Sequence, residues 1–295
     1  MTLYAATGAI EQGFVYGIMV IGVYLTFRIL DFPDLTVDGS LPLGAAISAV
    51  AITSGVNPYL SLVYAMGGGF LAGMVTAVLN TRFKILHLLA SILTMIALYS
   101  INIRIMSGPN VALLGVNTVF DPVIGLGVPP HYAGLVVFAA FAILVVSAII
   151  WFLGTELGQA MLATGDNPQM IRSLGVNTHT IIILGVGLSN GLVAFSGALV
   201  AQNQGAADVG MGIGTIVAGL ASVIIGETIF GTRSTARAFI AALLGSIVYR
   251  MAIALALGLN IGGFSFNPSD LNLITAILVV GALIAPQLKD RFLNK

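Results

Sequence analysis

Three carboxylates stand close together near the start of the chain, between long apolar runs. Asp31, Asp34 and Asp38 all lie in RILDFPDLTVDGSLPLGAA, residues 28–46. A charge within a lipid-soluble sequence is costly, so these side chains are expected to be paired, hydrogen-bonded or exposed to a water-filled path. The stretch therefore either builds a turn between two membrane segments or contributes to a solute path.

Helix capping is the simpler of these two interpretations. Pro33 and Pro42 are expected to stop regular helix. Asp38 or Ser40 can then accept hydrogen bonds from the free N–H groups at the start of the next helix. We therefore expect Asp38 to cap that helix in a solvated turn, in preference to contacting a solute directly.

The remaining reactive residues are not arranged for catalysis or metal binding. The sequence contains no GxxxxGK[ST] loop to hold ATP phosphates, no G-x-S-x-G elbow and no cysteine. His87, His131 and His179 are scattered, without a second histidine or a carboxylate at metal-ligand spacing. We therefore predict no enzyme activity, no cofactor and no metal site in this chain.

The composition indicates an integral membrane protein. Of 295 residues, 58% are hydrophobic and only 7% are charged, whereas soluble domains carry roughly 25% charged residues. The formal net charge is zero, which argues against a nucleic-acid partner. We predict an all-α polytopic protein of the bacterial cell membrane, with the lipid bilayer as its surroundings and one transmembrane domain over residues 1–295.

Nine apolar segments are predicted to lie in the membrane, since a crossing helix needs about 20 residues. They are 12–30, 41–55, 58–80, 85–106, 131–153, 181–204, 213–230, 234–258 and 270–286. The short segments 41–55 and 213–230 each follow an acid and glycines, with Asp38 and Asp208 six residues before a glycine. Short segments at matching places in two halves predict an inverted repeat around a transport pathway.

The basic residues predict the orientation. Nine crossings place the following basic residues of the loops and the C-terminal tail on one side of the membrane: Arg82, Lys84, Arg172, Arg233, Arg237, Lys289, Arg291 and Lys295. The loops on the opposite side contain no Lys or Arg. The positive-inside rule then places the C-terminus and the 154–180 loop in the cytoplasm and the N-terminus outside.

Polar side chains in or beside these segments should face protein or water rather than lipid. Glu227 is expected to pair at a helix end, and Arg250 must pair or reach the interface. The others are candidates for lining a translocation path: Asp38, Ser40, Tyr99, Asn102, Asn190, Gln202, Asn203, Gln204 and Asp208.

The 154–180 loop carries complete helix punctuation at its centre. Asn167 is predicted as an N-cap, Pro168 as the first helical residue and Gly175 as the C-terminal stop. Such a short helix is marginal in water by itself, so we expect it to rest on the membrane or on another protein.

Four stretches in order resemble the permeases of the branched-chain amino acid and ribose class of ABC importers. They are DFPDLTVDGSLPLGAA, LLASILTMIALYSINIRIMSGPN, LGQAMLATGDNPQMIRSLGVNTHTIIILGVGLSNGLVAFSGAL and AQNQGAADVGMGIGTIVAGLASVIIGE. The second and fourth look closest to the tryptophan/tyrosine-type branch, which works with a lipoprotein binding protein. The resemblance runs from about residue 8 to residue 285.

The resemblance implies a function and a set of partners. The chain would be the permease subunit of a binding-protein-dependent importer for a small polar solute, an amino acid before a sugar or nucleoside, with aromatic amino acids among the candidates. It would pair with a second permease copy, with the path at their interface, and with an extracytoplasmic binding protein and an ABC ATPase. The loop helix would be the coupling helix that docks on the ATPase through Gly165, Asp166, Asn167, Ile171, Arg172, Leu174 and Gly175.

A self-contained secondary transporter or channel is the alternative, and it would need a coupling-ion site or a pore filter. The intramembrane acids are few and lie close to helix ends, which favours the importer.

Overall fold

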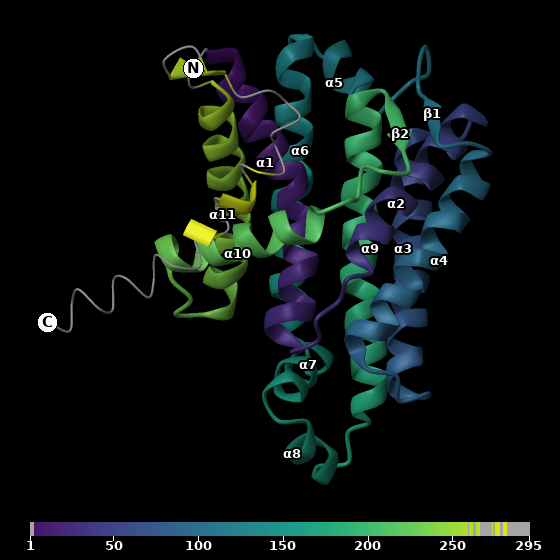
Figure 1. The fold of residues 1–295 in the computed structure, drawn as a ribbon, viewed down its shortest axis with the longest axis vertical. Coiled ribbons are helices and arrows are strands. Elements are labelled where there is room, and N and C mark those ends of the chain that lie inside the picture. Colours follow the sequence, from purple (N-terminus) through teal and green to yellow (C-terminus); the bar gives the residue numbers. More distant parts are fainter. Residues whose placement is uncertain are drawn as a thin grey trace, which may run out of the picture.

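The computed structural model describes residues 3–258, 260–261, 264–265, 273, 275–277 and 280–281. The elements are α1 (Leu3–Tyr24), the π-helical turn η1 (Leu25–Ile29), α2 (Val37–Thr53), α3 (Pro58–Thr81), α4 (His87–Met106), β1 (Asn110–Ala112), α5 (Asp121–Gly125), α6 (Pro130–Leu153), α7 (Glu156–Asp166), α8 (Pro168–Ser173), α9 (Thr178–Gln204), β2 (Ala206–Asp208), α10 (Thr215–Phe230), α11 (Thr235–Leu257), β3 (Asn260–Ile261) and β4 (Phe264–Ser265). The described chain is thus almost entirely helical, as predicted (Figure 1).

Helices occupy eight of the nine predicted crossings. Within the described residues, six helical segments are long and apolar enough to cross a membrane, and α2 and α10 are the shorter apolar helices. Most of the ninth predicted crossing, 270–286, lies outside the described residues. The count of nine and the inverted repeat therefore stay predictions.

The prediction that Pro42 stops regular helix is wrong. Helix α2 begins at Val37, so Pro42 lies inside its second turn. Proline lacks an N–H and cannot donate to the carbonyl four residues earlier, here that of Asp38. Gly212 packs against this place, because a Cβ on it would lie 2.0 Å from the Asp38 carbonyl oxygen. The proline is tolerated where another segment covers the interrupted turn.

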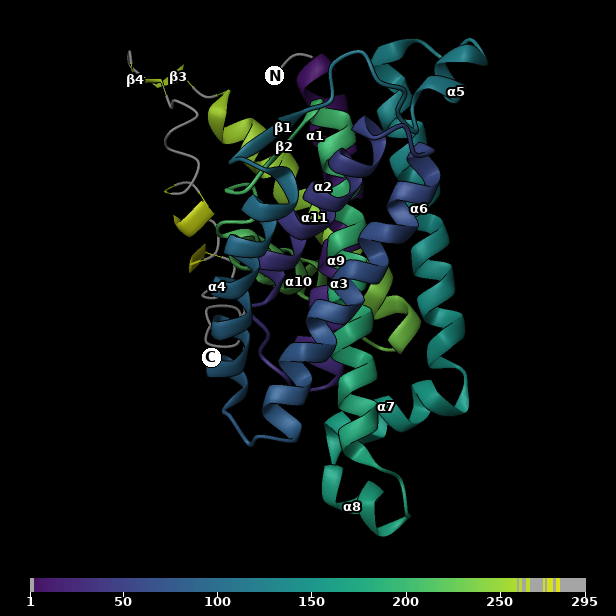
Figure 2. The same cartoon turned by 90° about the vertical axis from the view of Figure 1, so that its right-hand side faces the viewer.

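Helix α9 is central to the bundle and packs against α1, α2 and α3. Helix α1 also contacts α6, α10 and α11, and α10 lies across the bundle at mid-height (Figure 1). Both views place α7 and α8 at one end of the molecule, and α5 and the N-terminus at the other (Figures 1 and 2).

Glycines allow these helices to approach closely. A Cβ on Gly44 of α2 would lie 1.8 Å from the Ala194 carbonyl oxygen of α9, and one on Gly197 of α9 would lie 2.0 Å from that of Leu41. Gly69 and Gly73 of α3 likewise face the α9 backbone. Close backbone contact through small residues is the usual packing of transmembrane helices, which lack a hydrophobic force between them.

The long helices α1 and α9 are each followed in the chain by one of the two short apolar helices, α2 after α1 and α10 after α9. Strand β2 follows α9 and pairs antiparallel with β1, with Asn110 opposite Asp208. Residues 209–214 then lead to α10 and pass the start of α2. The pairing therefore holds the 209–214 segment beside the first turn of α2.

Candidate functional site

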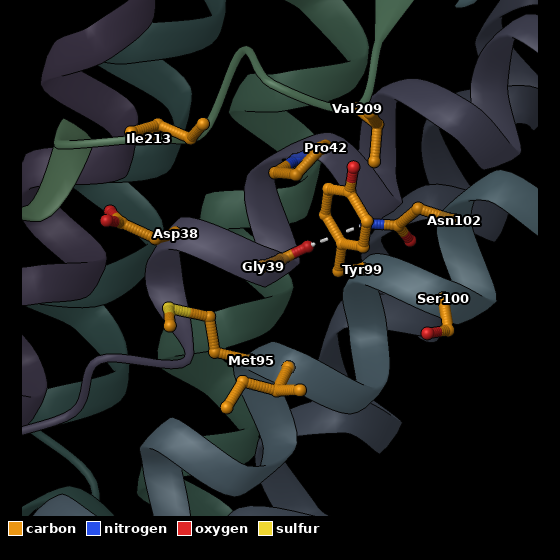
Figure 3. A pocket seen from close by; sticks show the side chains of 10 residues that line it. Asp38, Gly39, Pro42, Met95, Tyr99, Ser100, Asn102, Val209 and Ile213 are labelled. Carbon is orange, nitrogen blue, oxygen red and sulfur yellow. Dashed lines mark hydrogen bonds between the residues drawn. The ribbon is translucent and has the colours of Figure 1, made fainter. Parts of the chain in front are cut away.

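A cavity of about 410 Å³ lies between α2, α4 and the segment after β2 (Figure 3). We call it the α2–α4 cavity; it is lined by Asp38, Gly39, Pro42, Met95, Ile96, Tyr99, Ser100, Asn102, Val209 and Ile213. Three of the predicted path residues meet here, Asp38 from α2 and Tyr99 and Asn102 from α4, although Asp38 stands more than 60 residues before the other two in the chain. A mostly apolar cavity with a few polar groups is the common form of a small-molecule site.

Asn102 is fully buried and holds α4 to α2. Its Nδ2 donates to the Gly39 carbonyl oxygen at 3.2 Å, which fixes the orientation of the side-chain amide (Figure 3). Among the buried side-chain oxygen and nitrogen atoms of the described residues, Asn102 Oδ1 is the one that has no hydrogen-bond partner. Buried polar atoms are nearly always paired, so this acceptor is unusual.

Asp38 caps a helix, but not the predicted one. The N-cap position of α2 is Thr36, without a side-chain cap bond, and the Asp38 carboxylate turns instead to α10. Its Oδ2 accepts from Gly214 N at 3.0 Å, and its Oδ1 accepts from Ile216 N at 2.9 Å and Thr215 Oγ1 at 3.0 Å. The first N–H groups of a helix need acceptors and favour a negative charge, which explains the arrangement.

Ser40 also does not cap α2, because it lies inside that helix in a buried network. Its Oγ donates to Asn190 Oδ1 at 2.7 Å, and Asn190 Nδ2 donates to Asp34 Oδ2 at 2.6 Å. Asp34 Oδ1 accepts from Thr36 N at 2.9 Å, so Asp34 rather than Asp38 shapes the turn that enters α2. Ser40 and Asn190 thus connect α2 with α9 and do not line the α2–α4 cavity.

Gln202 belongs to a second buried network at the other end of α9. Its Nε2 donates to Ser48 Oγ at 3.1 Å and Ser61 Oγ at 3.3 Å, and its Oε1 accepts from Val119 N at 3.0 Å. Because its nitrogen and its oxygen are both hydrogen-bonded, to α2, α3 and the loop before α5, Gln202 connects these segments with α9.

The last three path candidates lie near the end of α9 and beyond it. Asn203 Nδ2 donates to Glu11 Oε1 at 2.9 Å, next to a separate cavity of about 350 Å³. Gln204 is exposed, and the exposed Asp208 accepts from Gly210 N at 2.7 Å. The structure therefore does not gather the nine candidates into one site.

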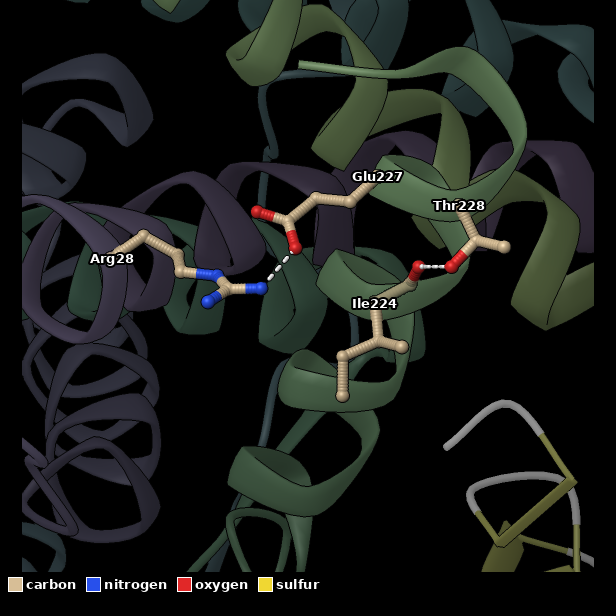
Figure 4. A network of polar contacts seen from close by, with 4 residues as sticks. All are labelled: Arg28, Ile224, Glu227 and Thr228. Atoms are coloured by element: carbon tan, nitrogen blue, oxygen red, sulfur yellow. Dashed lines mark hydrogen bonds and ion pairs between the residues drawn. The ribbon is translucent and has the colours of Figure 1, made fainter. Parts of the chain in front are cut away.

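Two charged residues within the membrane segments find partners. Glu227 of α10 forms an ion pair with Arg28 of η1, which confirms the predicted pairing role (Figure 4). Arg250 of α11 lies 3.7 Å from the centre of the Tyr16 ring and donates to Gln12 Oε1 at 3.4 Å. A guanidinium over an aromatic face keeps its charge while its stem stays among apolar groups.

The predicted loop helix is present as α8. Asn167 Oδ1 accepts from Met170 N at 3.0 Å, Pro168 is the first residue, and Gly175 has a φ of +86° after the last turn. Helix α7, which we did not predict, precedes it and is capped by Thr155, whose Oγ1 accepts from Gly158 N. The two helices lie at the end of the molecule opposite α5, with α7 beside the start of α9 and α8 at the tip (Figure 2).

Some of the predicted coupling residues pack against the permease, and the others are exposed on the α7–α8 hairpin. Ile171 is buried against the chain itself, and a Cβ on Gly165 would meet the Ile29 carbonyl oxygen at 1.7 Å. Arg172 Nε donates to Thr178 Oγ1 at 2.7 Å. By contrast, the Leu174 side chain is 70% exposed. Asp166, Asn167 and Gly175 are exposed as well.

The family model described as branched-chain amino acid transport system / permease component matches residues 6–285. The chain belongs to this permease family. One relative, the tyrosine transport system permease protein of Clostridioides difficile, is 42% identical over 272 residues, which are 92% of this chain and 88% of that protein. The ribose import permease protein of Escherichia coli K12 is 25% identical over 74% of this chain and 68% of its own length.

Solved structures share the fold of this permease. An ABC transporter solved in an inward-facing conformation matches with a TM-score of 0.53 at 14% identity, covering 97% of this chain and 85% of that one. Membership of the family, and not the likeness of fold, makes this protein a multi-pass membrane protein and the permease component of an ABC importer; the members of the family are transport permeases and not themselves enzymes.

Sequence reasoning missed two kinds of site residue. The apolar lining side chains Met95 and Ile96 look like any other residues of an apolar helix, so no local signal marks them. Asp34 was visible as an acid between apolar runs, but its role depends on Asn190, which is far away in the chain.

Proposed function

We propose that this permease imports an amino acid, an aromatic one such as tyrosine, from an extracytoplasmic binding protein, using ATP hydrolysis by a separate subunit. The observation that carries the proposal is the 42% identity to a tyrosine transport system permease protein along nearly the whole of both chains. The α2–α4 cavity supports it, because its mainly apolar wall and few polar groups suit a small amphipathic solute.

Energy enters through the α7–α8 hairpin in this proposal. The hairpin lies at one end of the bundle, with Ile171 buried and Leu174 exposed. Leu174 therefore gives the exposed side of this capped and anchored hairpin an apolar side chain that a pocket on a partner would cover. Of the predicted coupling residues, Asp166, Asn167, Arg172, Leu174 and Gly175 are the ones positioned to touch an ATPase, and Gly165 and Ile171 support them from within.

Two copies of the permease form the path in the proposal, with the solute passing between them. The α2–α4 cavity fits this arrangement, since Ile96, Tyr99 and Ile213 on its rim are exposed in the single chain. A second copy would convert this open cavity into an enclosed passage.

The test is uptake of radiolabelled L-tyrosine by cells that lack their own tyrosine carriers and express the permease with its ATPase and binding protein. We expect uptake to depend on all three proteins and to stop when the lysine of the ATPase phosphate loop is changed to alanine. Uptake by the permease alone, or uptake that survives this alanine variant, would instead identify a self-contained transporter. L-Ribose and D-ribose serve as controls that should not be taken up.

A further inference from the structure

We propose that Asn102 and Tyr99 form a solute-recognition site in the α2–α4 cavity. Asn102 Oδ1 accepts a hydrogen bond from an N–H or O–H group of the solute, and the Tyr99 ring covers the apolar part of the same molecule. The inference rests on the proposed import function and adds to it the residues that touch the solute and the chemical class they select.

The unpaired oxygen of Asn102 is the first observation. The amide cannot turn its nitrogen toward the cavity without losing the bond from Nδ2 to the Gly39 carbonyl, so the oxygen remains as a fixed acceptor. Asn102 is 0% exposed and Oδ1 has no partner. A buried acceptor without a donor costs free energy, and a solute donor entering the cavity would remove this cost.

The neighbouring carboxylate does not compete for this role. Both oxygens of Asp38 are engaged by the first turn of α10, with three hydrogen bonds of 2.9–3.0 Å. These bonds occupy three of the roughly four acceptor positions of the carboxylate, so Asp38 has little capacity left for a donor of the solute. Asn102 Oδ1 is therefore the buried acceptor of the cavity wall that still lacks a donor, and a solute reaches it when the side chains that cover it move.

The rest of the wall determines the class of solute. Met95, Ile96, Pro42, Val209 and Ile213 are apolar, and the Tyr99 ring stands on α4 one turn before Asn102 (Figure 3). The lining contains no Lys or Arg, so a solute with net negative charge would have no counterion. The cavity thus suits a neutral or zwitterionic solute with an apolar body, such as an aromatic amino acid, over a phosphorylated or dicarboxylic one.

Site-directed labelling tests this assignment directly, because the chain has no cysteine of its own. Met95→Cys places a thiol in the α2–α4 cavity, whereas Ala97→Cys places one two residues away in the apolar groove between α3 and α4. In cells expressing the complete transporter, we expect a charged methanethiosulfonate reagent to label Met95→Cys, and L-tyrosine to slow this labelling at least threefold. Ala97→Cys should show no protection by L-tyrosine.

The second measurement removes the acceptor. Asn102→Leu has nearly the same size, and we expect it to lower L-tyrosine uptake about tenfold, the usual effect of losing one hydrogen bond to a charged group. Asn80→Leu is the matched control, because Asn80 Nδ2 also donates to a backbone carbonyl, that of Ile85 at 2.8 Å, away from the cavity. In a protein that carries both Met95→Cys and Asn102→Leu, L-tyrosine should no longer slow the labelling of the cysteine. A general structural defect in a membrane-inserted protein would not remove this protection alone.

The outcomes separate this inference from the proposed function. If the parental transporter takes up L-tyrosine but Met95→Cys is not protected, the site assignment is wrong and the import function stands. The same holds if Asn102→Leu and Asn80→Leu transport equally well. The protection of Met95→Cys needs no change at Asn102, so it decides the matter even if Asn102→Leu fails to insert. If the parental transporter takes up no L-tyrosine, both conclusions fall.

Discussion

At the scale of single residues, the Asp38 carboxylate connects the two short helices. It is part of α2, but all three of its hydrogen bonds go to the start of α10, more than 170 residues later in the chain. Both carboxylate oxygens accept hydrogen bonds from donors of α10, so a side-chain N–H group at this position would face another donor. Ordinary helix caps accept asparagine about as well as aspartate, and this one should not.

We therefore predict that Asp38→Asn lowers stability by about 1–2 kcal/mol, since its amide nitrogen would leave one donor of α10 unpaired. Asp38→Ala should cost at least twice as much, because all three donors lose their acceptor. The thermal unfolding of the purified variants in detergent measures this order. Asp208→Asn is the control: Asp208 is exposed and accepts one local bond, from Gly210 N. Equal unfolding temperatures for the asparagine variant at position 38 and the parental protein would contradict the cap.

At the scale of elements, the predictions succeeded where the signal is local. Asn167, Pro168 and Gly175 lie within nine residues of one another, and cap, first turn and stop all appear as expected. Pro42 misled us because a proline ends a helix by default, and whether it is tolerated depends on Gly212, which covers the turn from a distant segment. Helix α7 was missed because its cap, Thr155, precedes a sequence of mixed polarity in which glycines dilute the helical pattern.

Glycine spacing also gives a prediction for the packing of α2 on α9. Gly44→Ala would place a Cβ 1.8 Å from the Ala194 carbonyl oxygen, so the two backbones must move apart. We expect a loss of about 1–3 kcal/mol, typical of overpacking. Gly67→Ala in α3 is the control, because a Cβ there meets nothing within 4 Å and alanine favours the helix by up to about 1 kcal/mol. Unfolding temperature and membrane yield report both changes, and equal behaviour of the two variants would contradict the close contact.

At the scale of the whole molecule, the path residues show the limit of sequence reasoning. Polar side chains in apolar helices were recognised one by one, but three-dimensional pairing decided their roles. Asn190 meets Asp34 and Ser40, whereas Asn102 remains with a free acceptor in a cavity. Nothing in the local pattern distinguishes these two asparagines, since each lies in an apolar helix with a serine one or two residues before it.

The orientation of the molecule in the membrane is a prediction that the cysteine-free chain makes easy to test. Gln169→Cys lies at the tip of the α7–α8 hairpin, and Leu114→Cys lies between β1 and α5, near the opposite end. In intact cells, a membrane-impermeant maleimide should label Leu114→Cys at once and Gln169→Cys only after the membrane is permeabilised. The positive-inside distribution of Arg82, Lys84 and Arg172 is the reason. The opposite labelling order would reverse the topology.

The last prediction is that an ATPase partner moves the permease through the α7–α8 hairpin. It depends on the contrast between the buried Ile171 and the exposed Leu174. Ile171 is 6% exposed and ties α8 to the rest of the permease, so a push on the hairpin reaches α9 and η1 through packed atoms. Leu174 is 70% exposed and is available to a partner. Changing Leu174 to Asp should remove an anchor worth about 2 kcal/mol, roughly thirtyfold in affinity, without disturbing the fold.

We expect the Leu174→Asp protein to reach the membrane at the parental level, to lose the co-purifying ATPase and to stop transport, while the external binding protein still captures its solute. Leu114→Asp is the matched control, since Leu114 is 86% exposed and lies near the other end of the molecule. It should keep both the ATPase and transport. An ATPase that co-purifies equally with both variants would show that the energy enters elsewhere, because the only difference between them is the end of the permease at which an exposed leucine has become a charge.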